Sequence, residues 1–202
     1  MERMLVSEDN ARIEAVLEWW FGEPPLQPQA KWFRRSKATD AEIAERFGAE
    51  HARAASGELD HWTATARGTL ALVILLDQFS RNLYRDSEQA FACDGRARQL
   101  CLEALQRQLD AALHCLERAF LYMPLMHSED RELHQTSVSL YEALHQSAPA
   151  ELAAACKSFC EFAHRHKVVI DRFGRYPHRN SVLGRHTTAQ EQAFLAEHPT
   201  GF

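Results

Sequence analysis

The feature that most constrains this sequence is an uninterrupted apolar run over residues 70–76, which gives way to polar side chains within one helical turn. A helix that is apolar on every side belongs inside a protein core, because any exposed face would lose the free energy gained by burial. The run therefore predicts a buried central helix from about residue 63 to residue 82. Four polar residues lie at its end: Asp77, Gln78, Arg81 and Asn82.

These four polar residues admit two interpretations. Asp77 and Arg81 are four positions apart, so they project from the same side of the helix. The same interval separates Gln78 from Asn82. Because a buried polar group without a partner costs roughly 1–3 kcal/mol, the pairs need contacts. They either tie down the end of the helix through internal contacts or form the floor of a pocket.

Length and composition are those of one soluble globular domain over residues 1–202. Hydrophobic residues make up 46% of the chain and charged residues 25%, which are ordinary values for this class. The net charge of −5 argues against binding to nucleic acid or to an anionic membrane. The longest apolar run is far shorter than the ~20 residues that span a bilayer. Five irregularly spaced cysteines and acids at the N-terminus favour a cytoplasmic protein.

Apolar residues recur at helical spacing along the chain, and no stretch alternates with period two between turn signals. The prediction is an all-α fold of antiparallel helix pairs, without a repeat of fixed length. Pro124 is expected to end one helix, Ser128 to cap the next, and Thr188 with Glu191 to form a capping box. The helices are predicted over about 10–21, 39–57, 63–82, 86–105, 113–123, 128–144, 149–173 and 188–195.

Histidines mark two further stretches. His127 and Glu129 lie on a connection between helices, where functional groups concentrate, although Ser128 and Glu129 also suit a helix N-terminus. His166 falls on the apolar seam of the 149–173 helix. It is either a hydrogen-bonded core residue or a functional group, that is, a general base or a ligand. Its neighbour His164 is two positions away and diverges from it, which is poor spacing for metal binding. From the sequence we therefore assign no metal ligand and no cofactor.

An arginine-rich stretch follows that helix. Residues 172–185 contain four arginines, one histidine and no acid, in a chain whose net charge is negative. The planar arginine side chain suits carboxylate or phosphate, and Gly174 and Pro177 favour a loop of defined shape. The alternative is that these arginines cap helix ends and pair with surface acids. The candidate ligand-binding residues here are Arg175, His178, Arg179, Asn180 and Arg185.

Three ordered motifs resemble those of an uncharacterised bacterial family known as domain of unknown function 924. They are residues 77–82, residues 124–129, and residues 173–180 together with 183–185; residues 16–22 and the pair Trp32-Phe33 fit as well. The resemblance implies an all-helical fold near the tetratricopeptide-like superfamily, with helix pairs packed around one buried central helix. Ser80 stands where we expect proline in the family's motif. The family supplies no established reaction, substrate or catalytic residue.

Three hypotheses of function follow. The leading one is a pocket for a small anionic ligand, built from the polar end of the central helix and the arginine-rich stretch. It predicts that Arg179→Ala weakens ligand binding and leaves Tm nearly unchanged. The second is a hydrolase in which His127 or His166 is the general base, Glu129 or Asp77 orients it, and arginines stabilise negative charge. The third is a helical scaffold that binds a protein or peptide.

Overall fold

The computed structural model describes the backbone of residues 2–198 and the side chains of residues 7–198. These residues form helices and no strand, so the all-α prediction is confirmed. The α-helices are α1 (Glu2–Phe21), α2 (Lys37–Ala55), α3 (Ala66–Val73), α4 (Ser80–Leu83), α5 (Asp94–Gln106), α6 (Cys115–Met126), α7 (Arg131–Gln146), α8 (Ala153–Phe173) and α9 (Ala189–Glu197). Between them lie the π-helix η3 (Ile74–Phe79) and the short 3-10 helices η1 (Ala30–Trp32), η2 (Asp60–Ala64), η4 (Glu88–Phe91), η5 (Leu109–Ala112), η6 (Ala150–Leu152) and η7 (Pro177–Arg179).

The apolar run at residues 70–76 is buried as predicted, with every side chain at most 1% exposed. It is not one α-helix from residue 63 to residue 82. Thr65 caps α3 by accepting a hydrogen bond from the backbone N–H of Gly68, and the chain changes to a π-helix at Ile74. Asp77 and Gln78 therefore fall in a π-helix, an arrangement that occurs frequently at functional sites.

Two helix ends differ from the prediction. Pro124 lies inside α6, which continues to Met126, because tertiary packing of this buried helix outweighs the hydrogen bond that proline cannot make. The N-cap of α7 is Asp130 and not Ser128; its carboxylate accepts from two backbone N–H groups of the first turn. As a result, residues 127–129 form a turn whose side chains are not used to start a helix.

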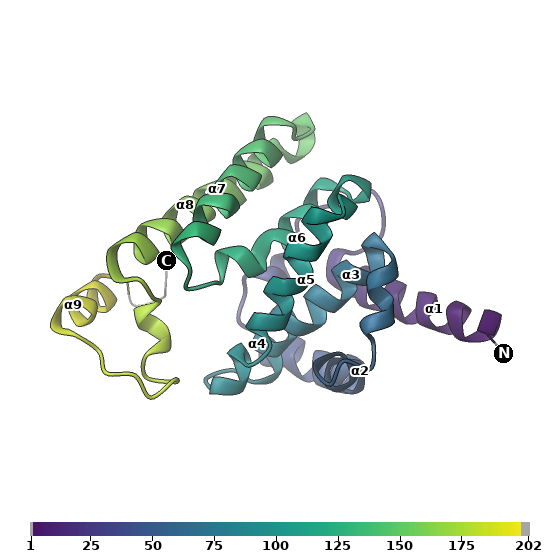
Figure 1. Cartoon of the computed structure of the whole chain (residues 1–202), viewed down its shortest axis with the longest axis horizontal. Helices are drawn as coiled ribbons and strands as arrows, with labels where there is room; N and C mark the ends of the chain where they lie inside the picture. The colour runs from purple at the N-terminus through teal and green to yellow at the C-terminus, as the bar shows by residue number, and fades with distance from the viewer. Residues whose placement is uncertain (1, 199–202) are drawn as a thin grey trace.

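Helices α7 and α8 lie side by side (Figure 1). Arg131, at the start of α7, donates to the carbonyl oxygens of Ile170 and Asp171 near the end of α8, so these two helices are antiparallel. The chain then turns at Gly174, in the left-handed region with φ +69°, and leads through η7 to α9. This C-terminal segment packs through Tyr176 and Phe194 against the end of α8. Within the described residues, no helix is both long and apolar enough to cross a membrane.

Candidate functional site

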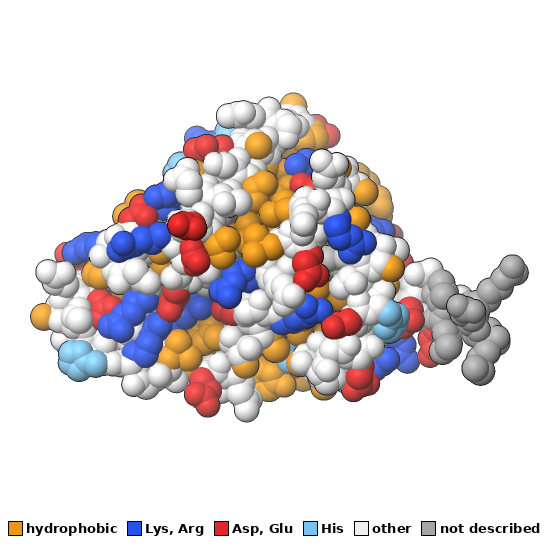
Figure 2. All heavy atoms as spheres, viewed as in Figure 1, with side chains coloured by type: hydrophobic (Ala, Val, Ile, Leu, Met, Phe, Trp, Pro, Cys, Tyr) orange, Lys and Arg blue, Asp and Glu red, His pale blue; other side chains and the backbone are white. Residues whose placement is uncertain are grey.

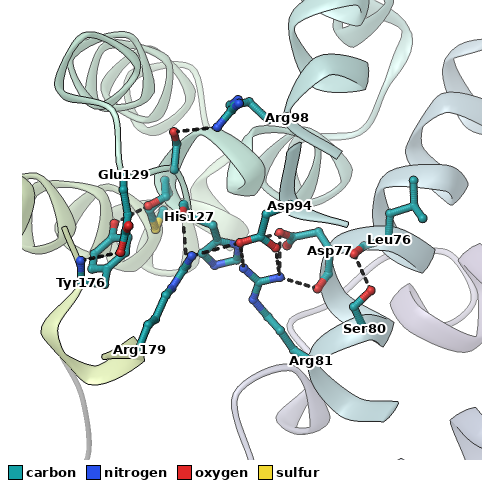
Figure 3. Close-up of polar contacts among 12 residues, drawn as sticks. Leu76, Asp77, Ser80, Arg81, Asp94, Arg98, His127, Glu129, Tyr176 and Arg179 are labelled. Atoms are coloured by element: carbon teal, nitrogen blue, oxygen red, sulfur yellow. Dashed lines mark hydrogen bonds and ion pairs between the residues drawn. The ribbon is translucent and has the colours of Figure 1, made fainter. Parts of the chain in front are cut away.

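A group of ionisable side chains from five parts of the chain meets beside the π-helix (Figure 3). It joins η3, α4, α5, the turn after α6, and η7. We call it the Asp77–His127 cluster. It consists of Asp77, Arg81, Asp94, His127 and Arg179.

Asp77 and His127 form the buried centre of the cluster. The Asp77 carboxylate has 0% exposure and accepts a hydrogen bond from Nδ1 of His127 at 2.8 Å. Gln78 donates to its second oxygen at 2.5 Å, and Arg81 lies 3.1 Å from the first. Burial alone would raise the pKa of Asp77, but the Arg81 charge and the hydrogen bonds hold that pKa well below its usual range. Asp77 is therefore a carboxylate at neutral pH.

The hydrogen bond to Asp77 fixes the tautomer of His127. With the proton on Nδ1, the neutral ring carries a lone pair on Nε2. Nε2 makes no hydrogen bond with any other residue that the structure describes. Burial lowers the pKa of His127 below its ordinary value, although the Asp77 charge opposes this effect. A neutral imidazole held in this way has the properties of a proton acceptor.

Two arginines share Asp94 on the other side of the cluster. Arg81 donates to both Asp94 oxygens, at 2.9 and 3.0 Å, and Arg179 donates to Oδ2 at 3.1 Å. Arg179 also donates to the backbone oxygen of His127 at 2.9 Å, and its guanidinium lies 4.5 Å from the centre of the Phe91 ring. Because two arginines face two aspartates, the cluster carries no net charge when His127 is neutral.

His127 lines two pockets that flank the cluster. The larger one, the Arg98 pocket, has a volume of 480 Å³ and mixes both signs of charge. It is lined by Glu88, Gln89, Phe91, Ala92, Asp94, Arg98, His127, Ser128, Glu129, Arg179 and Leu183.

The smaller one, the arginine pocket, has a volume of 270 Å³. Four arginines line it, and no aspartate or glutamate of the described residues does so. Its full lining is Trp32, Phe33, Arg34, Arg35, Gln78, Arg81, Asn82, Arg85, Met123 and His127.

The pocket arginines differ in their partners. Arg35 pairs with Asp86 at the surface, and Arg85 donates to both oxygens of Asp40, at 2.5 and 2.8 Å. The same Asp40 also accepts from the Asn82 amide at 2.8 Å. Arg34 makes no hydrogen bond and no ion pair with another described residue. No carboxylate of the described residues therefore neutralises the charge of Arg34.

The other candidates for acid–base chemistry lie apart from Asp77. Glu129 binds both terminal nitrogens of Arg185, at 2.6 and 3.0 Å, and accepts from the backbone N–H of Tyr176 at 2.8 Å. It therefore does not orient His127. His166 donates from Nδ1 to the carbonyl oxygen of Phe162 at 2.8 Å. Burial lowers the pKa of His166 to about 3.

The arginine-rich stretch does not form one pocket with the central helix. Arg175 donates to Glu191 at 2.7 and 2.9 Å, and Asn180 donates to the same carboxylate. His178 lies against the Tyr176 ring, and burial lowers the pKa of His178 to about 4. On the face shown in Figure 2, basic side chains are interleaved with acidic ones over this half of the molecule. From this stretch, Arg179 donates hydrogen bonds to Asp94 and to the backbone oxygen of His127 in the Asp77–His127 cluster.

Sequence reasoning missed four residues of this region. Arg85 follows Arg81 by another four positions, so extending the helical spacing would have found it. Arg34 and Arg35 directly follow the aromatic pair at 32–33, but nothing local indicates what they face. Asp94 starts α5 and carries no signal of its own for a role beside Arg81. No group of three or more histidine, cysteine, aspartate and glutamate side chains suited to a metal ion occurs among the described residues.

Comparison with known proteins adds a family but no reaction. A solved protein of unknown function from Agrobacterium tumefaciens is 34% identical in sequence, with a TM-score of 0.82. That similarity covers 93% of this chain and 98% of the other. No curated protein matches the sequence. The model of the family described as "Bacterial protein of unknown function (DUF924)" matches residues 16–199. The chain therefore belongs to the DUF924 family, as the three motifs predicted.

Proposed function

We propose that the arginine pocket binds a small anion that carries a carboxylate or phosphate group. The observation that carries this proposal is the lining itself: four arginines, no acid of the described residues, and in Arg34 a guanidinium without an internal partner. Arginine donates two parallel hydrogen bonds to either type of anion, which gives both affinity and orientation. The pocket volume of 270 Å³ suits a molecule of a few heavy atoms beyond the charged group.

The remainder of the lining supports the same function. Trp32 and Met123 are buried, and with the Phe33 ring they form an apolar wall. An apolar wall lowers the local dielectric constant, so the attraction between an anion and the arginines is stronger than it would be in water. Gln78 and Asn82 bring side-chain amides, whose carbonyl oxygens accept hydrogen bonds from hydroxyl or amide groups on the ligand.

Thermal unfolding with inorganic phosphate and with succinate tests the proposal and separates the two anion classes. At about ten times Kd, a bound anion stabilises the folded state by about 1.4 kcal/mol, which raises Tm by about 3–5 °C. The increase should shrink as sodium chloride is added, because salt screens the charges.

Arg34→Ala should abolish the increase without lowering Tm in the absence of anion. Arg165→Ala is the matched control, since it removes one exposed arginine from α8 and leaves the pocket lining intact. Equal increases in the wild type and in Arg34→Ala would contradict the proposal.

Other features stay predictions. A tetratricopeptide-like arrangement with a protein or peptide partner would need an extended apolar groove. The apolar pocket beside Phe33 and Phe159 has a volume of only 370 Å³. The cytoplasmic location rests on the cysteine pattern and also remains a prediction.

A further inference from the structure

His127 lies on the wall of the arginine pocket with its Nδ1 bound to a buried carboxylate, and anion binding alone does not require that arrangement. A histidine that only donated to an anion would not need a buried aspartate behind it. Asp77 is fully buried, and its carboxylate contacts His127, Gln78 and Arg81. The Arg81 guanidinium also donates to the backbone oxygen of Asp77. These contacts hold the imidazole in one tautomer, with the Nε2 lone pair available.

We propose that the protein is a hydrolase for carboxylic esters that carry a separate negative group, with His127 as the general base. The proposal rests on the proposed function, because the arginine pocket would hold the negative group of the ester. Asp77 is then a positioning residue, since it acts through His127 and does not touch the substrate. His127 lines both pockets, and we assign the arginine pocket to the charged half of the ester and the Arg98 pocket to water and the alcohol half.

The reaction balances without any further reactant. Nε2 of His127 takes a proton from water, and the water oxygen forms a bond to the carbonyl carbon of the ester. The bond between that carbon and the alcohol oxygen then breaks. The imidazolium returns its proton to the departing alkoxide, which leaves an acid and an alcohol. Negative charge develops on the carbonyl oxygen during attack, and arginine side chains beside the pocket stabilise such a charge.

The substrate class follows from the charges. An ester without a negative group would have nothing to pair with Arg34 and would bind weakly. We therefore expect a para-nitrophenyl monoester of succinate to be hydrolysed with a higher kcat/KM than para-nitrophenyl acetate. Arg34→Ala should raise KM for the succinate ester on the order of tenfold, which is the loss expected for one charge-assisted contact.

The decisive variant is His127→Asn. Asparagine places an N–H donor where Nδ1 of histidine lies, so it keeps the bond to Asp77 but has no basic nitrogen. It should bind succinate as the wild type does and hydrolyse the succinate ester about 100- to 10,000-fold more slowly. An unchanged rate would overturn the inference.

The pH profile tests the role of Asp77. The wild-type rate should be constant at neutral pH and fall as His127 becomes protonated, at a pH below the ordinary histidine pKa of about 6.5. Asp77→Asn should lower the rate and move this fall to lower pH, because the carboxylate raises the pKa of His127. The charged and titratable groups that act on His127 are Asp77, Arg81, Asp94, His134, His166, His178 and Arg179.

Two outcomes separate this inference from the proposed function. If succinate binds but neither ester is hydrolysed faster than in buffer, the hydrolase inference is wrong and the anion pocket stands. If succinate and phosphate both fail to bind, the proposed function is wrong and the ester inference falls with it.

Discussion

In the C-terminal segment, residues 174–197, the arginines pair with carboxylates. In the arginine pocket, by contrast, four arginines share a lining that contains no acid of the described residues. Glu191 accepts two hydrogen bonds from Arg175, and Glu129 accepts two from Arg185. In the pocket, the acids that pair with Arg35 and Arg85 lie outside the lining. If the arginine pocket binds an anion as proposed, the position of the counter-charge, and not the number of arginines, distinguishes a ligand-binding basic region from a structural one.

Asp77→Ala should have the largest effect on stability. The change removes a fully buried carboxylate and leaves the Arg81 charge and the His127 N–H without one of their partners. Breaking a buried pair in this way costs about 3–5 kcal/mol, which urea denaturation would measure. Asp86→Asn is the control, because it removes the surface partner of Arg35 and tolerates the positive φ at that position. Similar free energies of unfolding for the two variants would show that the buried Asp77 contributes no more to stability than the exposed Asp86.

Arg179→Ala should have the second-largest effect on stability. The sequence alone predicted that this substitution weakens ligand binding and leaves Tm nearly unchanged, and the structure changes that expectation. The Arg179 side chain is 8% exposed, binds Asp94 and the backbone oxygen of His127, and does not line the arginine pocket. We now expect a loss of about 1.5–3 kcal/mol, the usual contribution of hydrogen bonds to a charged group. Anion binding should persist. A variant with unchanged Tm and weakened phosphate binding would instead extend the anion site to η7.

Local spacing predicted part of this site. The Asp77–Arg81 pair and the Thr188–Glu191 capping box both form as their intervals indicated, since each involves residues within one helical turn. The burial of residues 70–76 also follows from their composition alone. These features need no knowledge of the rest of the chain.

Long-range partners could not be predicted in the same way. His127 and Asp77 are 50 positions apart, and the Arg179–Asp94 pair spans 85. Which acid meets which arginine depends on how α5, α6 and η7 pack, and spacing carries no information about that. The π-helix and the continuation of α6 through Pro124 have the same origin, because tertiary packing outweighs local preference in both cases.

Acid should weaken the folded state through its buried histidines. Burial lowers the pKa of His166 to about 3 and that of His178 to about 4, against about 6.5 in an unfolded chain. The unfolded state therefore binds more protons, and stability falls as pH decreases from about 7 to 4. His166→Asn keeps a donor for the Phe162 carbonyl and removes the titration, so its stability should depend less steeply on pH. If the free energy of unfolding, measured by urea denaturation from pH 7 to 4, changed equally with pH in the wild type and in His166→Asn, a contribution from His166 would be refuted.

Of Asp77→Ala, Arg179→Ala and Arg185→Ala, the last is expected to have the smallest effect on stability, and it gives the sharpest form of the comparison. Its side chain is 23% exposed and holds Glu129, itself 27% exposed, so the loss should be about 1 kcal/mol. Phosphate should raise Tm in this variant by as much as is expected for the wild type, because Arg185 does not line the arginine pocket. Arg34→Ala should show the reverse pattern, with unchanged stability and no response to phosphate. If Arg185→Ala also abolished the response, the C-terminal segment would belong to the ligand site, and the separation between structural and ligand-binding arginines would have to be redrawn.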